Sequence, residues 1–559
     1  MLFYSLTLLL VLPASLGLCS NPSGPIVHTS SGAYIGTHDT QNKIDVFLGM
    51  RFASPTARFM PATKVTANAT LLRSASRFGA DCPQLPEIGG VAGYAAGPAL
   101  QGSNQSEDCF FVNVWRPSGV SPEKKLPVLV YIYGGGYFGG AGSEWNGVGI
   151  VQRSVSINKP IIYITFNYRI GVLGFLGSRQ VPGTALNVGL QDQRDALRWI
   201  QNNAQAFGGD PSRITISGES AGASSVHMHY LYPDSVRTFR AGISSSGSSL
   251  TFNAPPCEWH DRPGGGYNML GNITGCGTGE GSFDCLQNMP FDTFWPLALT
   301  TYISSSVLPQ PVWAVTCKGP PGSLVDEYPA KKVLKGDFLK LPIITGTNKN
   351  EGNFIIGTSF IEMTPRPSRE EENDILREFI KVQAVNDTFV SNETVSKLLD
   401  LYAHPTEQLS NSTLYNRAAQ FETDYAFLAP QRLFLKSATA RGRKQDVWAY
   451  EFRQHLPGSP DFLGAFHTSD LYYLDMGFPS VGSDPETVKF QRQMQDIYIT
   501  FTNDARPGIE PFWPRYDEES RLVMQLEEGR VGPKTNSVRR DVTDFLNRVE
   551  VMQEFGRFG

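Results

Sequence analysis

The stretch FGGDPSRITISGESAG, residues 207–222, decides the fold. Within it, Arg213–Ser217 alternates polar and apolar side chains, which predicts a short buried strand. This strand runs into a turn where Ser220 has a glycine two residues away on each side. Strand and following helix can therefore approach closely while the serine hydroxyl stays exposed. Apolar residues at helical spacing over 190–207, with a stop at 208–211, predict a helix before the strand.

The serine segment matches, along its whole length, the active-site signature of the type-B carboxylesterases and lipases, which include the cholinesterases. A second match is EDCFFVNVWRP, residues 107–117, which departs from the usual pattern only in having Phe110 where leucine is common. Smaller matches stand at 167–171, 187–193 and 512–516, so the resemblance covers nearly the whole chain. In motif style the chain is most similar to secreted fungal members. The resemblance implies an α/β-hydrolase fold, with a large central, mostly parallel sheet flanked by helices.

The composition fits one large exported domain. The 559 residues are 41% hydrophobic and 18% charged, which supplies a large core, and no low-complexity linker or internal repeat divides them. We expect a signal peptide over 1–20 and a single domain over 21–559. The formal net charge of −5, without a block of lysine and arginine, argues against nucleic acid or an anionic membrane surface as a partner.

The amino-terminal residues predict secretion. Leu2–Leu18 is apolar but too short to cross a bilayer, and it ends in small residues as a secretory signal does. Because Val549–Gly559 contains no apolar run, we expect no transmembrane segment. Six Asn-X-Ser/Thr sites fit an extracellular glycoprotein: Asn68, Asn104, Asn272, Asn386, Asn392 and Asn411.

Cysteine usage agrees with export. Of seven cysteines, Cys19 falls within the expected signal, and the even number that remains suggests disulfides. The family resemblance implies two bonds, Cys82 with Cys109 and Cys276 with Cys285. Cys257 and Cys317 are left over, and a third bond between them stays open.

A serine hydroxyl needs a base to become nucleophilic, and in α/β-hydrolases the order along the chain is Ser, Asp or Glu, His. Downstream, His467 lies in GAFHTSDL, residues 464–471, in a loop after Val447–Phe452, which we predict to be the last strand. This segment resembles the histidine segment of the family, so His467 is the expected base. His455 is the alternative, although a solvated loop histidine is the more ordinary interpretation of it.

The expected acid is Glu351. The stretch LPIITGTNKNEG, residues 341–352, predicts a buried strand that ends in a polar turn, and its Glu-Gly pair resembles the glutamate site of the family. Glu351 would hold the tautomer of His467 and stabilise the imidazolium without accepting the proton.

Three glycines after a predicted central strand supply the expected oxyanion loop, in PVLVYIYGGGYF, residues 127–138. The backbone N–H groups of Gly135, Gly136 and Ala221 are expected to point at the carbonyl oxygen of the substrate. Tyr133 stands where many members of the family have histidine, which leaves the support of this loop open.

No metal site or cofactor is expected. His227 and His229 follow the serine turn, but no cysteine or carboxylate partner stands at zinc spacing, so packing or surface roles are expected for both. The serines of 244–249 fit polar turn chemistry, and none of them is expected to be catalytic.

The residues between Cys82 and Cys109 correspond to the lid of the lipase branch. Four glycines and three prolines within Pro83–Leu100 disfavour a long amphipathic lid helix, so a small or partial lid is expected. Medium-length acyl, aryl or hydroxycinnamoyl esters are then as plausible as triglycerides or sterol esters.

Together these features predict a secreted serine carboxylic-ester hydrolase that acts through an acyl-enzyme on apolar or aryl acyl esters. Small-molecule or lipid esters would be its partners. A feruloyl esterase or a lipase or sterol esterase is the alternative within the family. A non-catalytic, adhesion-type protein on the same fold is the alternative from another class, and the presence of Ser220, Glu351 and His467 argues against it.

Overall fold

The computed structural model describes residues 24–65, 71–84, 104–305, 312–358, 360–440, 445–478 and 481–559. The expected signal peptide, Asn68 and most of the expected lid, residues 85–103, lie outside these ranges. Within them, no helix is both long and apolar enough to cross a bilayer.

An eleven-stranded mixed sheet runs through the protein in the order β16-β15-β14-β13-β12-β11-β9-β10-β8-β4-β3. Its bounds are β3 (Thr37–Asp39), β4 (Ile44–Arg51), β8 (Phe111–Pro117), β9 (Leu126–Ile132), β10 (Ile162–Phe166), β11 (Gly209–Glu219), β12 (Ala241–Ser245), β13 (Ile343–Asn348), β14 (Val447–Phe452), β15 (Leu522–Leu526) and β16 (Gly532–Thr535). The strands from β10 to β15 pair in parallel, whereas the pairings at both edges are antiparallel. The predicted fold class is therefore confirmed.

Two sequence-based expectations need correction at the strands. Val447–Phe452 forms a strand with the expected bounds, but it is not the last one, since β15 and β16 follow it and extend the sheet. β11 also begins earlier than expected, at Gly209, because the residues expected to act as a stop already pair with Leu126.

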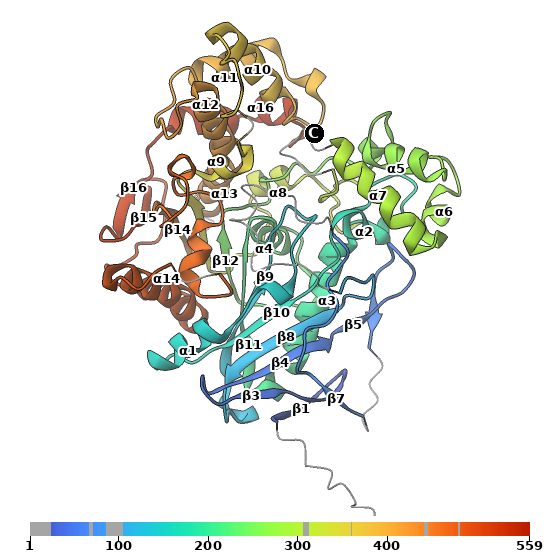
Figure 1. Ribbon diagram of the computed structural model, residues 1–559, viewed down its shortest axis with the longest axis vertical. Helices are drawn as coiled ribbons and strands as arrows, with labels where there is room; N and C mark the ends of the chain where they lie inside the picture. Colours follow the sequence, from blue (N-terminus) through green and yellow to red (C-terminus); the bar gives the residue numbers. More distant parts are fainter. Residues whose placement is uncertain are drawn as a thin grey trace, which may run out of the picture.

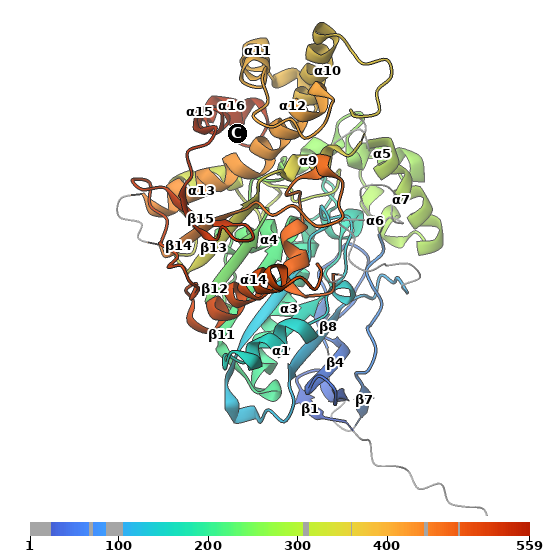
Figure 2. The same cartoon turned by 60° about the vertical axis from the view of Figure 1, so that its left-hand side comes forward.

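Helices cover both faces of the sheet (Figures 1 and 2). α1 (Val148–Ser156) packs against α14 (Pro485–Asp504) over one face, and α3 (Val188–Asn203), α4 (Ala221–Leu231), α8 (Pro329–Lys335) and α13 (Ala429–Thr439) lie over the other. Covered on both faces, the central strands are continuous apolar runs, and β9 and β10 are buried at every position.

Two further groups of helices lie at the end of the sheet where the parallel strands finish (Figure 1). One contains α5 (Gly266–Thr274), α6 (Ser282–Asn288) and α7 (Phe291–Ser305) and has an apolar cluster of its own. The other contains α9 (Glu351–Ile356), α10 (Arg369–Lys381), α11 (Asn392–Leu401), α12 (Thr413–Glu422), α15 (Arg540–Leu546) and α16 (Val549–Glu554), around a separate apolar cluster.

Two disulfides are present among the described cysteines. Cys82 is bonded to Cys109, and Cys276 is bonded to Cys285. Cys257 and Cys317 are buried free thiols, although the N–H of Cys257 donates to the carbonyl of Cys317 at 3.1 Å. The third bond that the sequence left open is therefore not formed in this structure.

A buried ion pair joins the end of β10 to α3. Nε and Nη2 of Arg169 each donate to a carboxylate oxygen of Asp192 at 2.8 Å, and Nη1 donates to the carbonyl of Met60. The side chains of Arg169 and Asp192 are 7% and 0% exposed. Losing one partner of such a pair leaves an uncompensated buried charge.

We expect Asp192→Asn to lower the free energy of unfolding by about 3 kcal/mol, because it leaves the Arg169 guanidinium buried without a counter-charge. Asp504→Asn is the matched control, since Asp504 pairs with Lys159 at the surface and should cost less than about 1 kcal/mol. Urea denaturation checks both values. Equal losses in the two variants would contradict the role assigned to the buried pair.

Candidate active site

The serine turn lies at the carboxyl end of β11. Ser220 has a φ of 57° and a ψ of −122°, which a residue with a side chain adopts only under strain. Its N–H donates to the carbonyl of Ser245 at 3.0 Å, and its carbonyl accepts from the N–H of Ser224 at 2.9 Å. β12 and the first turn of α4 therefore hold the strained residue in place.

The glycines around Ser220 are required by backbone contact. A Cβ on Gly222 would lie 2.0 Å from the carbonyl oxygen of Ile132, at the end of β9. A Cβ on Gly218 would lie 2.4 Å from the carbonyl carbon of Gly222. Both distances are too short for a side chain, so the sequence spacing reflects how closely α4, β9 and β11 approach one another.

The expected base and acid are in direct contact. Nδ1 of His467 lies 2.6 Å from Oε2 of Glu351, and the other oxygen of Glu351 accepts from the N–H of Asn348 at 2.6 Å. Glu351 is fully buried and His467 is 4% exposed. By contrast, His455 is half-buried and lies near Ser459, so it is His467 that the fold brings to the acid.

The loop of His467 is fastened to the turn of Glu351 by backbone and amide groups. The N–H of Asn350 donates to the carbonyl of Ala465 at 2.9 Å, and Oδ1 of Asn350 accepts from the N–H of Ala465 at 3.1 Å. Nδ2 of Asn348 donates to the carbonyl of Phe466 at 2.7 Å. These bonds fix the histidine ring relative to the acid.

The second ring nitrogen of His467 faces the serine turn. Its Nε2 lies 3.2 Å from Oε1 of Glu219, the residue directly before Ser220. The imidazole is thus placed between two buried carboxyl groups, one of which belongs to the turn that carries the serine. Glu219 was not predicted as a site residue.

Burial and carboxyl neighbours control the protonation of this group. Burial raises the pKa of Glu219 to about 8, although nearby His467 opposes the shift. Burial alone would lower the pKa of His467, but Glu219 and Glu351 outweigh it and raise the pKa to about 9. Because the two groups interact strongly, they titrate as a pair above neutral pH.

Further buried acids surround the pair. Burial raises the pKa of Asp470 to about 6 and that of Glu422 to about 7. Asp470 accepts from the hydroxyl of Tyr450 at 3.0 Å and from Nδ2 of Asn348 at 3.2 Å. The field of these groups favours a positive charge on the imidazole.

The glycine loop after β9 lies directly against the serine turn. A Cβ on Gly134 would lie 2.7 Å from the carbonyl oxygen of Glu219 and 3.0 Å from Cβ of Ser220. Gly135 and Gly136 have φ of 98° and 61°, in the left-handed region that favours glycine. Among the described residues no acceptor engages the N–H of Gly135 or Gly136, which leaves both donors available to a ligand.

Tyr133 is supported by Tyr168. Their rings stack with centroids 4.4 Å apart and an interplanar angle of 19°. The hydroxyl of Tyr133 donates to the carbonyl of Tyr168 at 2.8 Å, and the hydroxyl of Tyr168 donates to the carbonyl of Tyr133 at 2.9 Å. This reciprocal pair answers the question that the sequence left open about the support of the loop.

A π-helical turn, Thr423–Leu428, joins α12 to α13 and packs against the site. The ring of Phe427 lies 4.9 Å from the ring of His467, and Oγ1 of Thr423 accepts from the N–H of Gly352 at 2.9 Å. The same short segment therefore contacts both the base and the residue after the acid. Such π-helical turns are frequent at functional sites.

His227 and His229 serve packing. Burial lowers the pKa of each to about 3, so both are neutral, and Nε2 of His229 lies 2.9 Å from Oε1 of Gln193. The ring of His227 meets that of Phe434 edge-on. No group of three His, Cys, Asp or Glu side chains in the described part of the chain is arranged to hold a metal ion.

Comparison with known proteins identifies the class. The model of the carboxylesterase family matches residues 23–545, so the chain belongs to that family. It is therefore an enzyme that hydrolyses carboxylic esters.

The relatives include both lipases and esterases. The chain is 27% identical over 565 residues to the secreted triacylglycerol lipase LIP1 of Gibberella zeae, covering 94% of this chain and 89% of that protein. It is 27% identical over 515 residues to the para-nitrobenzyl esterase of Bacillus subtilis, covering 90% of this chain and 94% of that protein. The crystal structure of EstA from Aspergillus niger shares the fold, with a TM-score of 0.77 at 24% identity over 95% of this chain and 99% of that one.

We expect Gly134→Ala to lower kcat by at least about 100-fold, because the new methyl group would displace the serine turn from the glycine loop. Hydrolysis of p-nitrophenyl butyrate measures the change. Gly279→Ala is the matched control, since a Cβ there meets nothing within 4 Å. Wild-type turnover in folded Gly134→Ala would show that the contact is not needed.

We expect Glu219→Gln to move the acid limb of the pH profile of kcat/KM down by about one unit or more. The reason is that His467 works as a base only when neutral, and removing a carboxylate beside Nε2 lowers its pKa. Glu422→Gln is the control, since it removes a more distant buried acid and should produce a smaller shift. An acid limb that stays in place or moves up would rule out this electrostatic role of Glu219.

Proposed function

We propose that the enzyme hydrolyses esters through an acyl-enzyme formed on Ser220. The observation that carries the proposal is the position of His467, which has Nδ1 on Glu351 and Nε2 at the turn that carries the serine. In its neutral form His467 takes the proton from Ser220 Oγ as the oxygen attacks the ester carbonyl carbon. Glu351 keeps the ring oriented and stabilises the imidazolium.

The negative charge of the tetrahedral intermediate needs hydrogen-bond donors that are already in place. We assign this role to the N–H groups of Gly135, Gly136 and Ala221. The first two have no acceptor among the described residues, and the third begins α4, where helix N–H groups lack partners. The stacked pair of Tyr133 and Tyr168 holds the glycine loop at its base.

The reaction then continues in two steps. The imidazolium of His467 protonates the alkoxide oxygen as the ester C–O bond breaks, and the alcohol leaves an acyl group on Ser220. A water molecule, deprotonated by His467, attacks the acyl carbon, and the proton returns to Ser220 Oγ as the carboxylic acid is released. Each proton is therefore carried by one imidazole.

Apolar or aryl acyl esters are the proposed substrates. Aromatic side chains surround the reacting groups: the rings of Phe354 and Phe427 lie 6.4 and 4.9 Å from that of His467. Phe138 stands beside Gly136 and is 37% exposed. The named relatives act as lipases and esterases, so lipase, sterol esterase and feruloyl esterase specificity remain alternatives that a panel of p-nitrophenyl esters, methyl ferulate and an emulsified triglyceride separates.

We further propose that the enzyme is a secreted glycoprotein. A secreted relative and two disulfides support an extracellular location. Among the described acceptor sites, the side chains of Asn104, Asn272, Asn392 and Asn411 are exposed, which suits glycan attachment. Asn386 is half-buried, and its Oδ1 accepts from Thr388.

We expect Ser220→Ala and His467→Ala each to lower kcat for p-nitrophenyl butyrate by at least about 1,000-fold, because one removes the nucleophile and the other the base. Glu351→Gln should cost less, since it removes orientation of the ring and not the proton carrier.

Ser156→Ala, at an exposed helical serine, is the matched control and should leave kcat unchanged. Circular dichroism and thermal unfolding establish that each variant is folded. Near wild-type turnover in folded Ser220→Ala would overturn the assignment of the nucleophile.

A further inference from the structure

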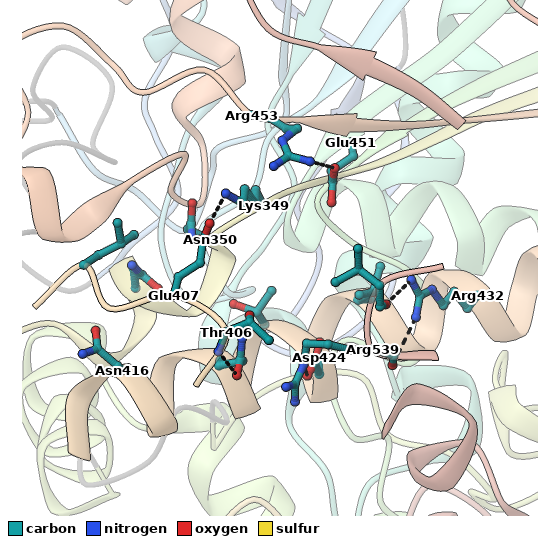
Figure 3. A pocket seen from close by; sticks show the side chains of 16 residues that line it. Lys349, Asn350, Thr406, Glu407, Asn416, Asp424, Arg432, Glu451, Arg453 and Arg539 are labelled. Carbon is teal, nitrogen blue, oxygen red and sulfur yellow. Dashed lines mark hydrogen bonds and ion pairs between the residues drawn. The ribbon is translucent and has the colours of Figure 1, made fainter. Parts of the chain in front are cut away.

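A polar pocket of about 230 Å³ lies behind the turn of the catalytic acid. It is lined by Lys349, Asn350, Asn353, Thr406, Glu407, Leu409, Asn416, Gln420, Thr423, Asp424, Leu428, Arg432, Glu451, Arg453, Val538 and Arg539. Figure 3 shows Lys349, Asn350 and Glu407 on one side of it and Asp424, Arg432 and Arg539 on the other. Ser220, Glu351 and His467 are not among the lining residues, so the pocket is distinct from the active site.

The charges of the pocket favour an anion. Four cationic side chains line it against three acidic ones, and each acid already has a cationic partner. Glu407 pairs with Lys349, Glu451 with Arg453 at 3.2 Å, and Asp424 with Arg539 at 2.7 Å. Glu451 is paired with Lys534 as well. Arg432 is therefore left without an acidic partner.

Arg432 is the strongest anion-binding group in the pocket. It is 2% exposed, and its terminal nitrogens donate to neutral acceptors, to Thr543 Oγ1 at 2.7 Å and to the carbonyl of Val538 at 2.8 Å. Burial lowers its pKa to about 10, so it stays protonated at neutral pH. Its buried Nε has no hydrogen-bond partner.

Arg539 offers a second unused donor. Its Nε donates to Asp424, but its buried Nη2 has no hydrogen-bond partner. A buried N–H without an acceptor is costly, and a charged one more so. Two such donors on side chains that line one pocket indicate a ligand with oxygen acceptors and negative charge.

We propose that this pocket binds a small oxyanion, a carboxylate or a phosphate. Guanidinium groups bind both anions through parallel N–H···O bonds. A volume of about 230 Å³ suits a small ligand, since one water molecule occupies about 30 Å³ in the liquid. The many amide, hydroxyl and charged groups of the wall disfavour an apolar ligand.

The pocket borders the catalytic machinery without sharing its reacting groups. Asn350 and Asn353 flank the short turn of Glu351, and Thr423 accepts from the N–H of Gly352. A bound oxyanion would therefore lie against the back of the turn that holds the acid. The proposal concerns binding alone and does not depend on the mechanism assigned to Ser220.

Isothermal titration of the full-length protein with inorganic phosphate and with acetate tests the proposal, with sodium chloride at matched ionic strength as the reference. We expect saturable binding of at least one oxyanion. The relative affinities of phosphate and acetate distinguish the two possible sources. Heat no different from that of chloride for both anions would overturn the proposal.

Two substitutions of opposite sign locate the site. Lys349→Gln should weaken binding about tenfold, because it removes a cation from the wall. Glu407→Gln should strengthen binding, because it removes an acid that competes for Lys349. General damage to the wall would weaken binding in both variants, so opposite signs are specific to an anion in the pocket.

Lys489→Gln is the matched control, since Lys489 forms an exposed ion pair with Glu486 on α14 and should leave the affinity unchanged. Arg432 is unsuitable for the test because its bonds to residues 538 and 543 hold the chain locally. Binding that responds equally to Lys349→Gln and Lys489→Gln would place the anion outside the pocket and overturn the proposal.

Discussion

The structure depends on the close approach of the serine turn to the end of β9. Only glycine fits at position 222, where a side chain would meet the backbone of Ile132, and only glycine fits at position 134, where it would meet the serine turn. This contact places the nucleophile beside the N–H groups of the glycine loop. It also explains why β9 and β11 are neighbours although they are far apart in sequence: the two parallel strands finish together at one edge.

The electrostatics of the site follow from burial. His467 is removed from water and placed between Glu351 and Glu219, so its charged form is stabilised by carboxylates at both ring nitrogens. A histidine in such a position is a strong base, but it is already protonated at moderate pH. The enzyme therefore gains basicity from its surroundings at the expense of the fraction of molecules that are ready to react.

The sequence predicted the parts of the site that have local patterns. Ser220 stands between glycines, Glu351 follows a buried strand, and the resemblance marks His467. The partners that depend on tertiary contact were missed: Tyr168 supports the loop from the next strand, and Glu219 meets His467 across 248 positions of chain. β15 was missed for a similar reason, since a short strand at a sheet edge has little local signal. The polar pocket draws its wall from five separate segments and has no sequence signature.

The π-helical turn Thr423–Leu428 has a consequence for insertions and deletions in this part of the chain. A π-helical turn contains one residue more than an α-helix would need. Removing one residue would restore regular winding, but it would also rotate everything beyond it by about 100° relative to α12. Phe427 would then turn away from His467, and Leu428 and Arg432 would turn away from the polar pocket. The length of this segment is therefore constrained at two places at once, although none of its residues takes part in bond making.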